Sequence, residues 1–215
     1  MLTPTREEFK APRQRGKVVP LRRRIPADLE TPVSAFLKLR NLPEGRGARF
    51  LLESVERGIQ VGRYSFIGVS PASTPRLDGD RVRIVRADGE VTVPLEGRDP
   101  LSFVRDEIRR TSAMDADDIP GPFAGAVGYI SYDVARFFER LPLPDDAGLD
   151  LPGYYFMIPH TLVVFDHVKS ELEVVVLPPP GDADASYDQA RSTVEALLAA
   201  LTSPLSLRDG ARPRA

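Results

Sequence analysis

Three short segments carry residue types that could bind a ligand or take part in a reaction. They are Leu51-Leu52-Glu53-Ser54, Gly62-Arg63-Tyr64-Ser65 and the run from Gly128 to Asp133. None of them is a general catalytic motif. The carboxylate of Glu53 and the hydroxyl of Ser54, at the end of an apolar strand, would suit the charged head group of an amino acid. The same pair is more often a solvated strand edge or the start of a turn, so the residues alone favour that interpretation over a ligand site.

Other polar and aromatic residues fit structural roles better than chemical ones. Tyr129, Tyr132 and Asp133 are typical of core aromatic residues and a helix-start carboxylate, and His167 is expected to be exposed at a hairpin turn. The glycines between Gly121 and Gly128 form neither a Gly-x-Gly-x-x-Gly motif nor a P-loop, because no Lys-Ser or Lys-Thr pair follows. Nucleotide binding is therefore disfavoured.

Composition excludes several function classes. The chain has 215 residues, a net charge of −2, no cysteine and two histidines. It therefore cannot form disulfides, thiolate zinc sites or cysteine nucleophiles, and it offers little for a metal site or a Ser-His relay. A near-neutral charge gives no general attraction to nucleic acid. Because no apolar run approaches the roughly 18 residues of a membrane span, and no signal-peptide core is visible, a cytoplasmic protein is expected.

The elements that must position these residues follow from local patterns. Thr31-Pro32 and Asp99-Pro100 each combine a capping side chain with a proline tolerated in the first helical turn, so both predict a helix start. Further helices are predicted from Ser131 to Glu139 and from about Ala183 to Leu201. Strands are predicted at Lys17–Leu21, Arg49–Ser54, Arg63–Val69, Arg81–Val85, Glu90–Val93, Thr161–Asp166 and Leu172–Leu177.

The order of these elements predicts the fold class. Ala87-Asp88-Gly89 indicates a tight hairpin, and the glycine-rich run from Gly121 to Tyr129 indicates a strand packed closely against another backbone. Hairpins interspersed with helices, without alternating βαβ units, predict an α+β fold built on a largely antiparallel sheet. Residues 1–16 are expected to be a basic, solvated and partly mobile leader, residues 17–203 one domain, and residues 204–215 a linker or tail.

Several of these segments together resemble one family. Arg49-Phe50-Leu51-Leu52-Glu53-Ser54-Val55-Glu56, Gly62-Arg63-Tyr64-Ser65-Phe66-Ile67-Gly68, Ala126-Val127-Gly128-Tyr129, Tyr132-Asp133 and Asp166-His167 occur in the order and spacing of anthranilate synthase component I. The upstream Val18-Val19-Pro20 and the segment from Thr31 to Phe36 are also similar to the opening of that family. The resemblance spans about residues 17 to 200.

The resemblance carries its own functional expectations. The family enzyme binds chorismate and Mg²⁺ and, with ammonia from a glutamine amidotransferase component II, forms anthranilate and pyruvate in tryptophan biosynthesis. Its active site lies in a later chorismate-binding region, which the resemblance places beyond Ala215. The chain is therefore expected to match only the N-terminal domain, to lack catalytic residues, and to be inactive alone, with Mg²⁺ held by the other region.

The resemblance also assigns a binding site. The family's N-terminal domain contributes to a site for L-tryptophan, the feedback inhibitor, and its Leu-Glu-Ser motif maps on Leu52, Glu53 and Ser54. Some members have a lysine ten residues beyond that serine, whereas this chain has Tyr64. Two alternatives stay open: a stand-alone tryptophan-sensing module, and the N-terminal part of the related 4-amino-4-deoxychorismate synthase component I.

Overall fold

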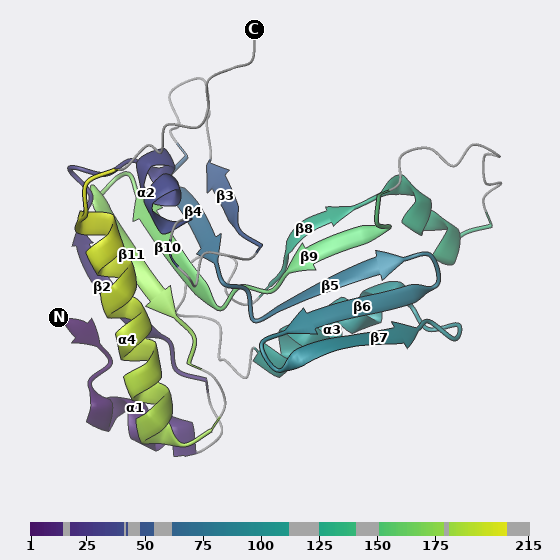
Figure 1. Cartoon of the computed structure of the whole chain (residues 1–215), viewed down its shortest axis with the longest axis horizontal. Helices are drawn as coiled ribbons and strands as arrows, with labels where there is room; N and C mark the ends of the chain where they lie inside the picture. The colour runs from purple at the N-terminus through teal and green to yellow at the C-terminus, as the bar shows by residue number, and fades with distance from the viewer. Residues whose placement is uncertain are drawn as a thin grey trace, which may run out of the picture.

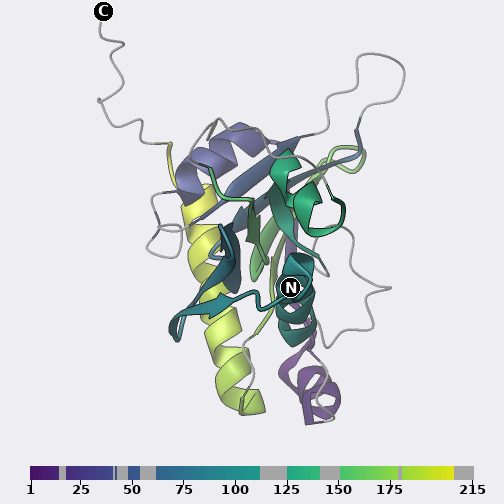
Figure 2. The ribbon, with the colours of Figure 1, turned by 90° about the vertical axis from the view of Figure 1, so that its right-hand side faces the viewer.

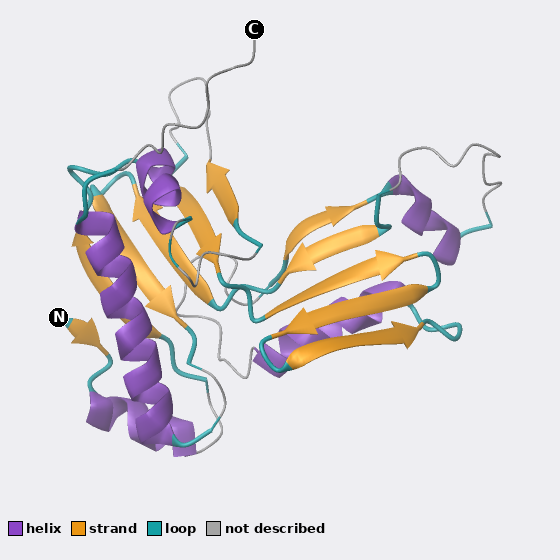
Figure 3. Ribbon diagram, viewed as in Figure 1, coloured by secondary structure: helices purple, strands orange, loops and turns teal. Residues whose placement is uncertain are grey.

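The computed structural model describes residues 1–14, 18–40, 42, 48–53, 62–111, 125–140, 151–178 and 181–205. Its strands form two antiparallel sheets, which appear as two separate groups in Figure 3. Helices cover one face of each sheet. This is the α+β fold with mostly antiparallel pairing that the sequence predicts.

The first sheet has six strands in the order β1-β2-β11-β10-β4-β3. Their bounds are β1 Leu2–Thr3, β2 Leu21–Pro26, β3 Phe50–Glu53, β4 Tyr64–Val69, β10 Thr161–Asp166 and β11 Glu171–Val176. The second sheet has five strands in the order β7-β6-β5-β9-β8. Their bounds are β5 Ser73–Asp78, β6 Arg81–Arg86, β7 Gly89–Pro94, β8 Val127–Ile130 and β9 Tyr154–Met157.

Helices pack on the first sheet from one side. They are α1 Arg6–Gln14, α2 Pro32–Leu39 and α4 Ala183–Thr202, and α1 lies beside one end of the long helix α4 (Figures 1 and 2). The buried side chains between helices and sheet include Phe9, Ala35, Ile67, Val163 and Leu197. Since a strand shows alternate residues to opposite faces, the other face of this sheet carries a different set of side chains.

The second sheet has a core of its own. Helix α3, Pro100–Thr111, packs Phe103 and Val104 against Leu77, Val82 and Ile84 of the sheet. A short 3-10 helix, η4 Tyr132–Phe137, follows β8. Both helix starts that the proline pattern predicts are confirmed: Thr31 caps α2 by accepting a hydrogen bond from the Ser34 amide, and Asp99 accepts one from the Leu101 amide at α3.

The two sheets meet where the chain passes from one to the other. The segment after β4 and the segment before β10 run side by side, since the Ala72 amide donates to the Ile158 carbonyl and the Ile158 amide donates to the Ser73 carbonyl. Val127 and Met157 of the second sheet pack against Leu162 and Val164 of the first. One end of the helix-free face of the first sheet is therefore covered.

Three sequence expectations differ from the structure. Over its described part, the predicted solvated leader holds α1, whose Phe9 is fully buried and stacks edge-on against Tyr187 of α4. The strand expected at Lys17–Leu21 instead begins at Leu21 and contains the arginines that follow. Tyr129 and Tyr132, expected in the core, are 41% and 84% exposed, because β8 is an edge strand and η4 packs Val134 and Phe137, not Tyr132, against the second sheet's core.

Candidate functional site

Two of the three residues that the family resemblance assigns to tryptophan, Leu52 and Glu53, lie at the end of β3. Leu52 is the Cα partner of Phe66 and Glu53 that of Ser65 on β4, so the two side chains point to opposite faces of the sheet. Both are exposed, and Leu52 lies on the face without helices. Ser54 lies outside the described residues. Of the predicted trio, only Leu52 is thus shown on the helix-free face.

The helix-free face changes from apolar to charged across the sheet. One row of cross-strand partners runs from Leu52 through Phe66 and Val164 to Glu173 and Arg24. The Tyr64 and Phe66 rings lie on the apolar side with their centroids 6.1 Å apart. A ligand on this face would therefore meet aromatic surface at one end and paired charges at the other.

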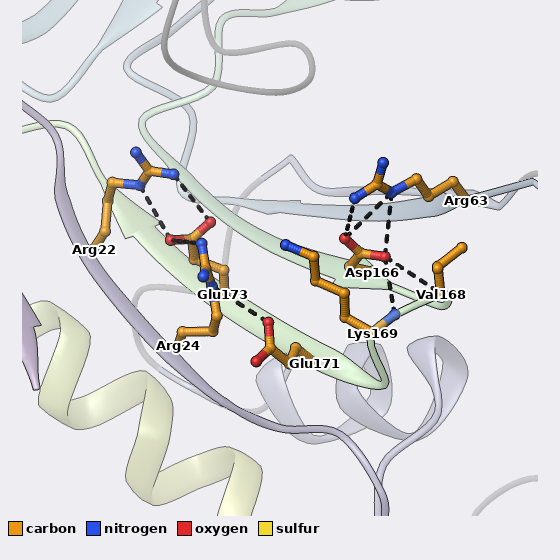
Figure 4. Close-up of polar contacts among 8 residues, drawn as sticks. All are labelled: Arg22, Arg24, Arg63, Asp166, Val168, Lys169, Glu171 and Glu173. Carbon is orange, nitrogen blue, oxygen red and sulfur yellow. Dashed lines mark hydrogen bonds and ion pairs between the residues drawn. The ribbon is translucent and has the colours of Figure 1, made fainter.

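A cavity of about 200 Å³ opens at the charged end of this face. Strands β2, β4, β10 and β11 and the turn between β10 and β11 supply its walls, and Figure 4 shows all of its charged side chains. The lining residues are Arg22, Arg24, Arg63, Tyr64, Val164, Asp166, Lys169, Glu171, Leu172 and Glu173. Because this is smaller than the usual pocket for a whole drug-sized ligand, a head group or a small ion suits its size.

The wall on the β2 side is a network of ion pairs. Arg22 donates from Nε and Nη2 to the two oxygens of Glu173 at 3.1 and 3.2 Å. Arg24 reaches the same carboxylate at 3.4 Å and lies 3.6 Å from Glu171. Glu173 is the more enclosed acid, with 14% of its side chain exposed against 38% for Glu171. The strand register explains the network, because Glu173 and Arg24 are direct partners.

The opposite wall is the turn between β10 and β11. Arg63 donates to Asp166 at 2.9 Å, and the same carboxylate accepts from the backbone amides of Val168 and Lys169 at 3.1 and 3.2 Å. The Arg63 hydrogen bonds, followed by these amides, hold the pKa of the Asp166 carboxyl below its usual range. Asp166 therefore stays ionised and fixes the turn that carries Lys169.

Elsewhere the described residues offer little for catalysis. The Ser65 hydroxyl lies 2.8 Å from His167 Nε2, but Ser65 is only 2% exposed, so it is not presented to a substrate. His167 itself is exposed, as the sequence predicts. Within the described ranges, no group of three or more His, Asp or Glu side chains could hold a metal ion. No helix there is long and apolar enough to cross a membrane.

Sequence reasoning missed most of the charged cavity. The sequence analysis gives Arg22 and Arg24 no role in a site, although they form one wall of the cavity. The available signal is the matching alternation of Arg22-x-Arg24 with Glu171-x-Glu173, which places two cations and two carboxylates on the same face of neighbouring strands. The partners are far apart in the sequence, so this match is visible only once β2 and β11 are known to pair.

The geometry defines a class of protein: an antiparallel α+β fold in which one sheet face is apolar at one end and charged at the other. The chain is related to anthranilate synthase component 1: it is 34% identical to the Pseudomonas putida protein over 196 residues and 43% identical to the Thermus thermophilus protein over 162 residues. These alignments cover 89% and 74% of this chain. They cover only 38% and 32% of the relatives, so the chain spans about a third of their length.

A solved structure shares the fold. Anthranilate synthase component I from Streptococcus pneumoniae aligns with a TM-score of 0.52 and 21% identity, over 87% of this chain and 39% of that one. No protein-family model matches the chain. The relatives are components of an enzyme, and this chain corresponds to part of one such component.

Proposed function

We propose that this chain acts as the regulatory and structural part of an anthranilate synthase component I. In this role it would contribute to a feedback site for L-tryptophan, while the chorismate-binding region, with its Mg²⁺, and a glutamine amidotransferase would supply the reaction. The observation that carries the proposal is the similarity of 34% to 43% over most of the chain. Because the relatives reported above are anthranilate synthases, we propose the tryptophan pathway rather than the folate branch.

The geometry supports a ligand site at the end of β3. Leu52, Phe66 and Tyr64 offer apolar and aromatic surface for an indole, and the charged cavity begins at Val164, directly beside Phe66 in the sheet. A tryptophan bound there could place its ring on the apolar end and its head group on the charged end. In this proposal the Leu-Glu-Ser motif contributes Leu52 to this face and Ser54 to the head group, while Glu53, which points to the opposite face, would act from the sheet edge at the end of β3.

The energetics predict weak binding by this chain alone. Covering an indole removes about 150–250 Å² from water, worth roughly 4–6 kcal/mol at about 25 cal/mol per Å². Association itself costs about 4–15 kcal/mol, so a site open on one side gains little net affinity. Micromolar inhibition, near −8 kcal/mol, would need walls from the chorismate-binding region. A stand-alone sensor would instead need useful affinity without those walls.

The test joins this chain to the remaining part of the Thermus thermophilus relative and compares Ser54→Ala with the unmodified fusion. We expect the tryptophan inhibition constant to rise about 5- to 150-fold, because a polar partner of the ligand is lost, while chorismate turnover stays near its starting value. Thr92→Ala, in the exposed edge strand β7, is the control and should change neither. An unchanged inhibition curve for Ser54→Ala would contradict the assignment.

The same preparation tests the catalytic part of the proposal. We expect the 215-residue chain alone to form no anthranilate from chorismate, ammonia and Mg²⁺, whereas the fusion does. Measurable anthranilate from the chain alone would contradict this division of labour.

A further inference from the structure

A second cavity lies on the helix side of the first sheet. Its volume is about 220 Å³, and its walls come from β1, β2 and the long helix α4, which crosses these strands in Figure 1. The lining residues are Leu2, Arg23, Tyr187, Arg191, Val194 and Glu195. This cavity is separate from the charged cavity described above, because Arg23 points to the sheet face opposite to that of Arg22 and Arg24.

The floor of this second cavity is apolar and held in place. Val194 is fully buried and Tyr187 is 6% exposed. The Tyr187 ring is fixed by the Phe9 ring, which meets it edge-on, and by the Arg6 guanidinium, which lies 4.8 Å from its centroid. Leu2 packs against the same core. A ligand would therefore meet apolar surface that needs no rearrangement.

The charges of the second cavity do not balance, since two arginines face one glutamate. Arg191 donates from Nε to Glu195 at 2.8 Å, one turn further along α4. The nearby aspartates of α4 are taken up by Arg6 and Lys10 of α1. Among the residues that the structure describes, the Arg23 guanidinium has no hydrogen-bond or ion-pair partner. Arg23 can therefore bind an anion without first breaking an ion pair.

The shape and polarity of the second cavity select the kind of anion. A guanidinium presents parallel N–H donors that match the two oxygens of a carboxylate. Arg191 gives only its Nε–H to Glu195, so other donors of its guanidinium remain for the same ligand. The apolar floor favours an anion that also has an apolar body, and the small volume limits that body to a few atoms or one ring.

We propose that this second cavity binds a small organic carboxylate. The carboxylate lies on the Arg23 guanidinium, with Arg191 beside it, and the apolar body covers Val194 and the Tyr187 ring. The site is on the other side of the sheet from the proposed tryptophan site. The inference goes beyond the proposed function and does not rest on it.

The experiment titrates the full chain with benzoate, with its neutral analogue benzyl alcohol, and with inorganic phosphate. The readout is the amide NMR signals of Leu2 and Val194, which line the cavity, and of Lys169, which lines the charged cavity. Arg23→Met removes the charge, and Arg23→Lys keeps the charge but loses the parallel donors. Arg81→Met is the matched control, because Arg81 is also an exposed strand arginine without a partner among the described residues, but on the second sheet.

We expect benzoate to shift the Leu2 and Val194 signals with a dissociation constant of about a millimolar, and Arg23→Met to raise that constant roughly ten-fold. Arg23→Lys should lie between the two, and Arg81→Met should change nothing. Benzyl alcohol and phosphate should each bind more weakly than benzoate, since one lacks the charge and the other the apolar body.

Three results would overturn the proposal. The first is equal benzoate affinity in Arg23→Met and the unmodified chain. The second is phosphate binding as tight as that of benzoate, which would mark a site for inorganic anions. The third is a benzoate response at Lys169 and none at Leu2 and Val194, even at tens of millimolar. Each of these results leaves the proposed tryptophan site standing, because that site is tested by inhibition of the fusion.

Discussion

At the scale of single residues, the most enclosed ion pair of the second sheet joins a strand to a helix. Glu107 of α3 is 4% exposed and accepts hydrogen bonds from Arg86 of β6 at 2.9 and 2.5 Å. Burial alone would raise the pKa of the Glu107 carboxyl, but the Arg86 hydrogen bonds outweigh it and hold the pKa below its usual value. The pair therefore makes the free energy of unfolding depend on pH.

Glu107→Gln should lower the free energy of unfolding by about 3 kcal/mol at pH 7, because it leaves the Arg86 guanidinium largely buried without its counter-charge. The folded pKa is lower than the unfolded one, so the native pair stabilises above pH 4.5 and loses this contribution as the pH falls through the folded pKa. Urea unfolding at pH 7 and pH 3 should thus show a smaller difference between the variant and the unmodified chain at pH 3.

The matched control for this prediction lies on the same sheet. Arg83 and Glu90 also pair across strands, but both side chains are nearly half exposed. Glu90→Gln should therefore cost at most about 1 kcal/mol. Equal losses of unfolding free energy for Glu90→Gln and Glu107→Gln would show that burial does not decide the strength of these ion pairs.

At the scale of elements, strand β8 depends on one glycine. A Cβ atom added at Gly128 would lie 2.0 Å from the Tyr155 carbonyl oxygen and 2.7 Å from the Phe156 Cα atom. The sequence predicted a strand packed closely against another backbone here, and the β8–β9 pairing confirms it over Val127–Ile130.

Gly128→Ala should destabilise the chain by about 1–3 kcal/mol, because β8 must move away from β9 to make room for the methyl group. Hydrogen exchange should speed up at the amides of Val127–Ile130 before those of β5 and β6. Thr92→Ala, in the other edge strand of this sheet, serves as control and should leave exchange in β8 unchanged. Unaltered β8 exchange in a folded Gly128→Ala chain would contradict the close approach.

Local sequence patterns predicted the elements that are formed by interactions between residues close together in the sequence. The helix starts at Thr31 and Asp99 and the hairpin of β10 with β11 depend on neighbouring residues, and all are confirmed. Strand β5 was not predicted, because Pro75 argues against a strand. Proline is tolerated here because the neighbouring strand β9 pairs with Arg76 and Leu77 of β5 and not with Pro75. Helix α1 was missed because its charges obscured Phe9, whose burial depends on the distant helix α4.

The candidate site was predictable only in part, because some of its residues are brought together by strands that are far apart in the sequence. The end of β3 follows from a local change from apolar to polar residues, so Leu52 and Glu53 could be placed on a strand. The opposite faces of these two side chains follow from strand register. The cavity could not be predicted, because it needs β2, β4, β10 and β11 side by side, and their pairing is decided by buried residues across the sheet.

At the scale of the whole molecule, apolar side chains gather around the edge strand β8 and η4. Ile130 is 49%, Tyr132 84% and Phe138 54% exposed. Exposed edges with apolar side chains favour strand addition between molecules. We therefore expect the chain to associate as its concentration rises.

Ile130→Lys should shift this association to higher concentration, because a charged edge residue opposes strand addition. Light scattering after size-exclusion chromatography would measure the mass across a concentration series. Leu29→Lys, which changes a single residue that is 94% exposed on the first sheet's side of the chain, is the control and should have no effect. A monomer at every concentration would contradict the expected association.

The side-by-side connections between the sheets also bear on the order of folding. Val69, the last residue of β4, and Thr161, the first of β10, are direct partners, so the entire second sheet is inserted between two adjacent strands of the first. Closing that long loop costs entropy, whereas the hairpins of β5, β6 and β7 join neighbours in sequence. The inserted sheet should form early and bring the ends of β4 and β10 together. Pairing between the strands of the first sheet should then begin at its junction with the second sheet and extend away from it.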